Sequence, residues 1–206
     1  MTAEVEGPTG PVAVSRTPKI GAGVGMPGWR FGLVIAILTV LELYSASLPN
    51  DASWYLWLFG GWLIAGLVWV LWLLMSAIAS LDRTRRALWR WGVIAALAIG
   101  TFAVAGSGAP LRLRFELSRP AFEALAAELS VPGAPDRIAD RPVGLYQAQD
   151  IERDEGGFRF MVPDTGCCIF GLWGGFVWMG VGEPVHQGDD RYEHLDGPWF
   201  VWEQNW

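Results

Sequence analysis

Three long apolar segments dominate the first half of the chain. They extend over about 31–48, 54–78 and 88–106, and the charged residues within them are Glu42 and Arg90. A helix of ~20 mostly apolar residues crosses the hydrocarbon core of a bilayer. The pattern therefore predicts three transmembrane helices within a membrane domain over 29–109. The Gly- and Pro-rich stretch 1–28 that precedes them has the composition of a disordered tail.

The pattern changes after residue 110. Apolar and charged residues alternate over 111–117, which predicts a half-buried strand. Apolar residues then recur at helical spacing as far as residue 129. Ser118 is a suitable cap for this helix, Pro120 suits its first turn, and Pro132 ends it.

Strand patterns follow the predicted helix. Segments 143–153 and 158–162 are joined by a Gly-rich turn, which predicts a hairpin, and a last strand is predicted over 199–204. The uncharged segment 167–181 is predicted to be a second hairpin that turns at Gly174-Gly175. A fourth membrane span is the alternative for this segment.

The expected fold class is membrane α, with three transmembrane helices, plus a small α+β domain over 110–206. In that domain one helix lies on an antiparallel sheet of about five or six strands, around one small core. The composition agrees with a membrane protein, because 52% of the residues are hydrophobic and the mean hydropathy is +0.29.

Four arginines between Asp82 and Trp91 fix the expected orientation, because arginine-rich loops between spans stay on the cytoplasmic side. The tail 1–28 is then cytoplasmic, and 110–206 lies outside the cytoplasmic membrane. Seven basic and five acidic residues precede residue 107, whereas eight basic and sixteen acidic residues follow. Such an acidic outer part repels phosphate backbones, so we expect no nucleic-acid partner.

One polar segment, 186–196, has residue types that bind metals, and it contains both histidines of the chain. Imidazole and carboxylate groups together suit a transition metal. The candidate ligands are His186, Asp190, Glu193 and His194. Their spacing matches no recognised metal motif, so we expect a solvated loop, with no bound metal and no cofactor.

The adjacent cysteines Cys167 and Cys168 are expected to be free buried thiols, because neighbouring residues make a strained disulfide. A redox pair or an intermolecular bridge is the alternative. The motifs of nucleophilic catalysis are missing as well. The sequence therefore predicts a protein that is not an enzyme.

Interaction rather than catalysis is the expected role of the aromatic residues in the outer domain. They exceed what one small core holds, so some are expected to form an exposed patch. The candidates are Trp173, Phe176, Trp178, Trp199, Phe200 and Trp202.

Two features of the spans allow a role within the membrane. Glu42 is an intramembrane carboxylate, for which a proton or ion role is the alternative to a structural one. Gly92, Ala96 and Gly100 form a small-residue stripe, which we expect to pack within the bundle. A dimerisation face is the alternative.

The outer domain resembles the C-terminal part of uncharacterised actinobacterial membrane-anchored proteins. The resemblance rests on the motifs LSRPAFEALA at 117–126, VGLY at 143–146, GGFRF at 156–160 and YEHLDGPW at 192–199. It covers about half the chain and implies a shared small extracytoplasmic domain, with no activity to transfer. The apolar stretch 168–181 departs from the Gly- and Pro-rich loop expected there.

Three functional hypotheses follow from these patterns. The first is a membrane protein that presents a small non-enzymatic domain for interaction at the cell envelope, with the bilayer and an envelope protein or a second copy as partners. The second is a metal-dependent envelope enzyme that uses the loop 186–196. The third is a small membrane subunit or immunity-type protein that acts through its helices, through Glu42 and the Gly92 face.

Overall fold

The computed structural model describes residues 28–49, 52–79, 84–154, 156–163, 173–185 and 188–204, with the backbone alone at 52–55, 76–79, 84–91 and 173. Within these ranges lie four helices followed by seven strands. The helices are α1 Trp29–Ser45, α2 Ala52–Ala79, α3 Thr84–Gly106 and α4 Ala109–Leu129. The strands are β1 Arg137–Ile138, β2 Arg141–Val143, β3 Tyr146–Asp154, β4 Gly157–Val162, β5 Trp173–Met179, β6 Asp190–Asp196 and β7 Trp199–Gln204.

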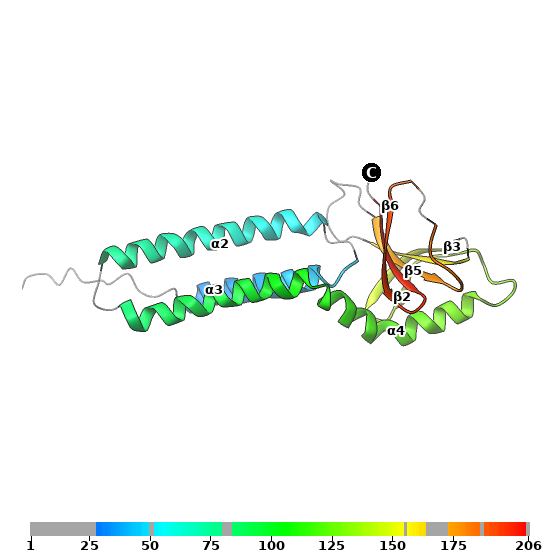
Figure 1. Ribbon diagram of the computed structural model, residues 1–206, viewed down its shortest axis with the longest axis horizontal. Coiled ribbons are helices and arrows are strands. Elements are labelled where there is room, and N and C mark those ends of the chain that lie inside the picture. Colours follow the sequence, from blue (N-terminus) through cyan, green and yellow to red (C-terminus); the bar gives the residue numbers. More distant parts are fainter. Residues whose placement is uncertain are drawn as a thin grey trace, which may run out of the picture.

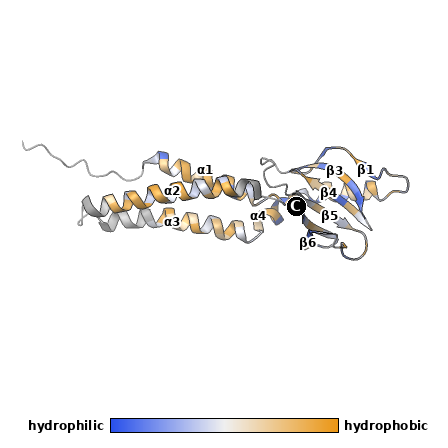
Figure 2. Ribbon diagram, turned by 90° about the horizontal axis from the view of Figure 1, so that it is seen from above, coloured by the Kyte–Doolittle hydropathy of each residue, from blue (hydrophilic) through white to orange (hydrophobic). Residues whose placement is uncertain are grey.

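Helices α1, α2 and α3 form an elongated rod, and α4 together with the sheet forms a domain at one end of it (Figure 1). Helix α1 packs against both of the others around Ile35, Trp62 and Ala65. Many large apolar side chains of the rod are exposed. The ribbon colours show mostly hydrophobic residues along the rod, and a mixture of hydrophobic and hydrophilic residues in the domain (Figure 2).

One helix of the described chain is by itself long and apolar enough to cross a membrane, over Leu56–Met75 in α2. The pair formed by α3 and α4 passes the same length and composition test only together, with a bend of 55° between them. The protein thus has one or two candidate membrane spans by these criteria. The predicted tail lies outside the described residues, except for Gly28.

Helix α4 corrects the prediction for its sequence. It begins at Ala109, so the strand predicted over 111–117 is wrong, and neither Ser118 nor Pro120 lies in the first turn. Its buried side chains recur every three or four residues, which is the period of a helix. They are Phe115, Ser118, Phe122, Leu125, Ala126 and Leu129.

The seven strands form one antiparallel sheet in the order β1-β3-β4-β5-β7-β6, with β2 also paired to β3. The predicted hairpin is confirmed, because β3 and β4 pair from Gln149–Met161 to Asp154–Gly157. The predicted last strand is also confirmed as β7. The strand predicted over 143–153 is wrong at its start, since a tight turn at Gly144-Leu145 separates β2 from β3.

The turn predicted at Gly174-Gly175 is wrong, because both glycines lie inside β5. A Cβ atom at Gly175 would collide with the carbonyl oxygen of Phe160 on β4 and would lie 3.0 Å from the indole nitrogen of Trp202. Glycine is needed here for a close approach of neighbouring strands rather than for chain reversal. Residues 167–172, including both cysteines, lie outside the described residues.

Apolar side chains fill both faces of the sheet. On one face, α4 inserts Phe115 and Phe122 among aromatic side chains from β3, β4, β5 and β7, with ring centroids 5.0–5.8 Å apart. On the other face, Val177, Met179, Phe200 and Trp202 form a second buried cluster. The domain therefore holds two layers of buried apolar groups where one small core was expected.

Candidate functional site

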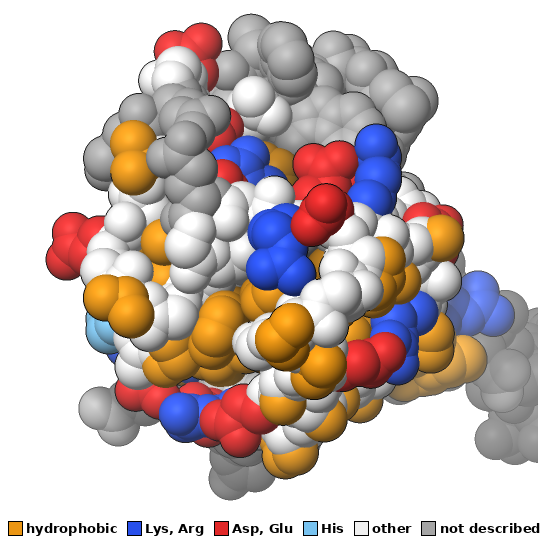
Figure 3. All heavy atoms as spheres, turned by 90° about the vertical axis from the view of Figure 1, so that its right-hand side faces the viewer, with side chains coloured by type: hydrophobic (Ala, Val, Ile, Leu, Met, Phe, Trp, Pro, Cys, Tyr) orange, Lys and Arg blue, Asp and Glu red, His pale blue; other side chains and the backbone are white. Residues whose placement is uncertain are grey.

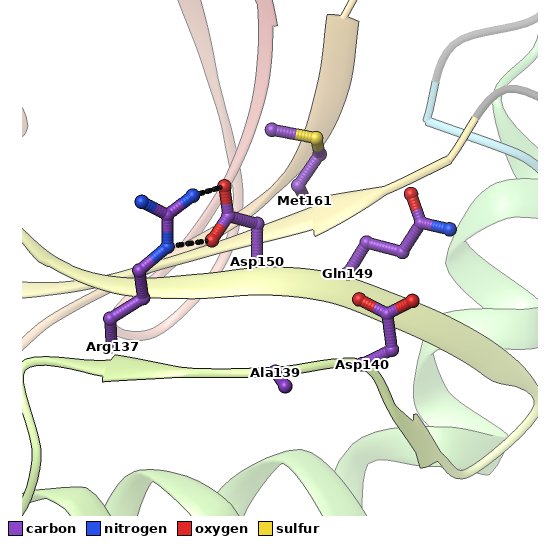
Figure 4. A pocket seen from close by; sticks show the side chains of 6 residues that line it. All are labelled: Arg137, Ala139, Asp140, Gln149, Asp150 and Met161. Atoms are coloured by element: carbon purple, nitrogen blue, oxygen red, sulfur yellow. Dashed lines mark hydrogen bonds and ion pairs between the residues drawn. The ribbon is translucent and has the colours of Figure 1, made fainter.

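A shallow hollow of about 630 Å³ lies where β1 meets the middle of β3 (Figure 4). Asp150 projects into it from a β-bulge, with a φ of 50° that non-glycine residues rarely adopt. Arg137 donates two hydrogen bonds to the Asp150 carboxylate, and this contact raises the pKa of the Arg137 guanidinium.

The other groups that line this hollow are one carboxylate, one amide and two apolar side chains. Its remaining lining comes from Ala139, Asp140, Gln149 and Met161. Two carboxylates against one guanidinium leave an acidic surface that suits hydrogen-bond donors. Among the described residues that line it there is no Ser, Thr, Cys or His side chain.

A more enclosed group of charges lies on the sheet face opposite α4. Here Arg159 of β4 donates hydrogen bonds to the Asp154 carboxylate at 3.0 Å and to the Tyr192 hydroxyl at 2.6 Å. It also forms an ion pair with Asp190 at 3.1 Å, and its guanidinium lies 4.7 Å from the ring centroid of Trp202. We call these five residues the Arg159 cluster.

The charged groups of the Arg159 cluster are largely buried. The Asp190 side chain is 4% exposed and that of Arg159 is 20% exposed, so this ion pair is largely shielded from water. Burial also raises the pKa of the Tyr192 hydroxyl to about 12, partly offset by the positive charge of Arg159. The hydroxyl therefore stays protonated and donates to the Asp190 carboxylate. The contacts of the Arg159 cluster thus join side chains of β3, β4, β6 and β7 on one face of the sheet.

The predicted metal ligands are not brought together in the described residues. Asp190 is engaged by Arg159, whose positive charge opposes a metal ion. Glu193 and His194 are neighbours on β6 and point to opposite faces of the sheet. The His194 ring lies 2.9 Å from the Gly197 carbonyl oxygen, and His186 lies outside the described residues. Over the described part of the chain, no group of three His, Cys, Asp or Glu side chains has the geometry to hold a metal.

The predicted aromatic patch is also altered. Trp199 and Trp202 are buried on the two faces of the sheet, as are Phe176 and Phe200. These four side chains therefore do not contribute to an exposed aromatic patch, because both faces of the sheet carry buried apolar clusters. Trp178 is partly buried and stacks on Phe158, and the side chain of Trp173 lies outside the described residues.

Glu42 is buried near the end of α1, close to the sheet domain.

The small-residue stripe of α3 does not show the packing within the bundle that the sequence predicts. Gly92, Ala96 and Gly100 are exposed, and nothing lies within 4 Å of a Cβ atom placed at either glycine. By contrast, Gly61 of α2 is closed off by Leu38 of α1. The stripe therefore does not pack against the described residues of the rod.

The rod and the domain are joined by a set of side chains that sequence reasoning did not single out. Arg114 of α4 donates to the Ser47 hydroxyl at 3.0 Å and to the Leu145 carbonyl at 2.6 Å. The Tyr146 hydroxyl donates to the Ser47 carbonyl at 3.1 Å, and burial raises the pKa of Tyr146. We call Tyr44, Ser47, Arg114, Leu145 and Tyr146 the joint.

Comparisons of the chain with models of known protein families, with curated proteins and with solved structures find no match.

Proposed function

We propose that the protein is anchored in the cytoplasmic membrane by α1, α2 and α3 and holds its sheet domain at the outer face as a non-enzymatic interaction module. The observation that supports this most is the outward apolar surface of the rod. Helix α2 alone exposes a long series of large apolar side chains, and a helix that is apolar on all sides belongs in protein or lipid. The series is Leu56, Trp57, Phe59, Leu63, Ile64, Leu67, Val68, Val70, Leu71, Leu74 and Met75.

Packing supports α3 as a span separate from α4. The side chains of Phe115 and Phe122 are completely buried against the sheet, so α4 belongs to the core of the domain. Helix α3 has 23 residues and is about 35 Å long at 1.5 Å per residue, enough for the hydrocarbon layer of about 30 Å.

The orientation follows from the arginines at the start of α3. The chain passes from these arginines, at the end of the rod far from the domain, to α4 at the other end (Figure 1). If the arginine-rich end stays in the cytoplasm, the domain lies outside. The joint then holds the domain in a fixed position on the rod.

The surface for a partner is proposed at the end of the domain that faces away from the rod. There, charged side chains of both signs are interspersed with apolar ones (Figure 3). Polar groups around apolar contacts are the usual make-up of a non-obligate protein interface. The loop that follows α4 lies at this end of the domain (Figure 1), and Val131, two residues after the end of α4, is 57% exposed.

In-cell photocrosslinking tests this proposal. A photoreactive amino acid at Val131 is expected to give a discrete adduct with an envelope protein. The same amino acid at Leu145, which is 54% exposed at the joint, is the matched control and is expected to give no protein adduct. The proposal fails if the chain is integrated in the membrane but gives no protein adduct at Val131 or at other positions on the end of the domain that faces away from the rod.

A second candidate function is favoured by the exposed stripe of α3. Small residues four apart let two helices approach closely in a membrane. We propose, as the alternative, association of α3 with a second copy or with a membrane subunit. A crosslinker at Ala96 that gives protein adducts, while one at Val131 gives none, would support this function over the first.

A further inference from the structure

A second hollow lies at the joint, between the end of α1 and the turn that connects β2 and β3. Its volume is about 340 Å³, within the range of small-molecule sites. Tyr44 and Leu48 line it from the α1 side, and Pro142, Leu145 and Val162 line it from the sheet side. Among the described residues that line it, Arg114 is the one that carries a full charge.

Arg114 forms no ion pair with a carboxylate of the described residues. Arg119, Arg141, Arg153 and Arg159 each have a carboxylate within 4 Å, whereas Arg114 has none in the described part of the chain. A guanidinium has five N–H donors. Within the described part of the chain, two of them are used, by the neutral oxygens of Ser47 and Leu145.

Two tyrosine rings hold this guanidinium in place. Its central carbon lies 4.5 Å from the ring centroid of Tyr146 and 5.1 Å from that of Tyr44. The hydrogen bonds and ring contacts fix the orientation of the guanidinium. A guanidinium that is held in one orientation and has free N–H donors can bind a phosphate group. Two of its N–H groups donate parallel hydrogen bonds to two phosphate oxygens.

The hollow lies at the depth of lipid headgroups, if α1, α2 and α3 span the membrane as proposed. Arg114 follows the end of α3 by eight residues, about 12 Å of helix at 1.5 Å per residue. The bend of 55° between α3 and α4 reduces this to about 7 Å along the α3 axis. The headgroup layer is itself about 5–8 Å thick on each side of the bilayer.

We propose that this hollow binds the headgroup phosphate of an anionic phospholipid of the outer leaflet, with Arg114 as the phosphate ligand. The acyl chains extend from the hollow along Tyr44 and the exposed apolar side of α1. An anionic lipid is favoured over a zwitterionic one because the charged side chain among the described lining residues is Arg114, which has no carboxylate of the described residues within 4 Å. The inference rests on the proposed function.

The test uses the full chain solubilised in a neutral detergent. Native mass spectrometry measures lipid binding with phosphatidylglycerol, phosphatidylcholine and inorganic phosphate as separate probes. We expect phosphatidylglycerol to bind at least about tenfold more tightly than phosphatidylcholine, and inorganic phosphate not to compete at equal concentration.

Substitutions then assign the site. Arg114→Gln is expected to weaken phosphatidylglycerol binding by about tenfold to a hundredfold, the range of a lost charge-assisted pair. Arg114→Lys, which keeps the charge and loses the fork, is expected to be intermediate. Arg191→Gln is the matched control, because Arg191 is exposed on β6 and has no carboxylate within 4 Å in the described residues.

Several outcomes would overturn the inference. One is equal binding of the two lipids, and another is competition by inorganic phosphate, which would indicate a site for the free ion. Unchanged phosphatidylglycerol binding in Arg114→Gln would do the same. If Arg114→Gln does not fold, two measurements still test the inference. They are the binding of phosphatidylglycerol relative to phosphatidylcholine by the unchanged chain, and the binding of phosphatidylglycerol by Arg114→Lys. Extraction of the chain from membranes by alkaline carbonate would contradict the proposed function instead, independently of the lipid measurement.

Discussion

Replacement of Leu125 by alanine tests whether the first part of the domain is a helix on the sheet. Leu125 is 3% exposed, and Leu117, two turns earlier on α4, is 66% exposed. A buried Leu→Ala change costs about 2–5 kcal/mol, whereas a surface change stays within about 0.5 kcal/mol. We therefore expect Leu125→Ala to lower the free energy of unfolding of the domain by about 3 kcal/mol and Leu117→Ala to leave it almost unchanged.

Pulse proteolysis of the full chain in urea and mild detergent measures this difference. With a denaturant slope of about 1.5 kcal/mol per molar urea, the Leu125 variant should lose about 2 M in its unfolding midpoint. The strand first predicted over 111–117 places Leu117 and Phe115 on the same buried face. Equal losses in the Leu117 and Leu125 variants would therefore refute the helix and its packing.

Three further predictions concern the domain. Gly144→Ala should lower stability by about 1–3 kcal/mol, because Gly144 has a φ of 61° and its new Cβ atom would lie 2.5 Å from the Cβ atom of Ser118. Asp190→Asn should cost about 2 kcal/mol, through the lost charge of the buried pair with Arg159. Stability should fall between pH 10 and about 12, because the unfolded state ionises Tyr192 before the folded state does, and Tyr192→Phe should reduce this fall.

Each of these predictions has a control measured by the same urea midpoint. Gly133→Ala shares the positive φ but has open space around the new Cβ atom, so it should cost less than Gly144→Ala. Arg137→Gln breaks an ion pair at a 65% exposed side chain and should cost less than about 1 kcal/mol. Equal losses of stability in Gly144→Ala and Gly133→Ala would contradict the steric argument. Equal losses in Asp190→Asn and Arg137→Gln would contradict the argument from burial. An unchanged alkaline profile in Tyr192→Phe would contradict the third.

The sequence predicts the elements that depend on local pattern. The hairpin around Gly156 and the last strand Trp199–Gln204 follow from alternation and turn residues, and the helices of the rod follow from uninterrupted apolar runs. The strand predicted over 111–117 fails because Leu113 and Leu117 are exposed on a helix, although they alternate with charges. The helical spacing from Phe115 to Phe122 was the signal that would have extended the helix.

The candidate sites depend on contacts that no local pattern contains. Gly175 follows another glycine, which favours a turn in sequence, yet it is required by Trp202 and Phe160 on neighbouring strands. The contact of Arg114 with Ser47 joins residues 67 positions apart, and only the packing of the rod on the domain brings them together. Burial of Trp199 and Trp202 likewise follows from a sheet covered on both faces.

The most direct test of the account is the position of the C-terminus relative to the membrane. Alkaline phosphatase, which is active only outside the cytoplasm, and a fluorescent protein that folds only inside it are fused in turn after Trp206. The account predicts an active phosphatase fusion and a dark fluorescent fusion. A fluorescent fusion with an inactive phosphatase would contradict it.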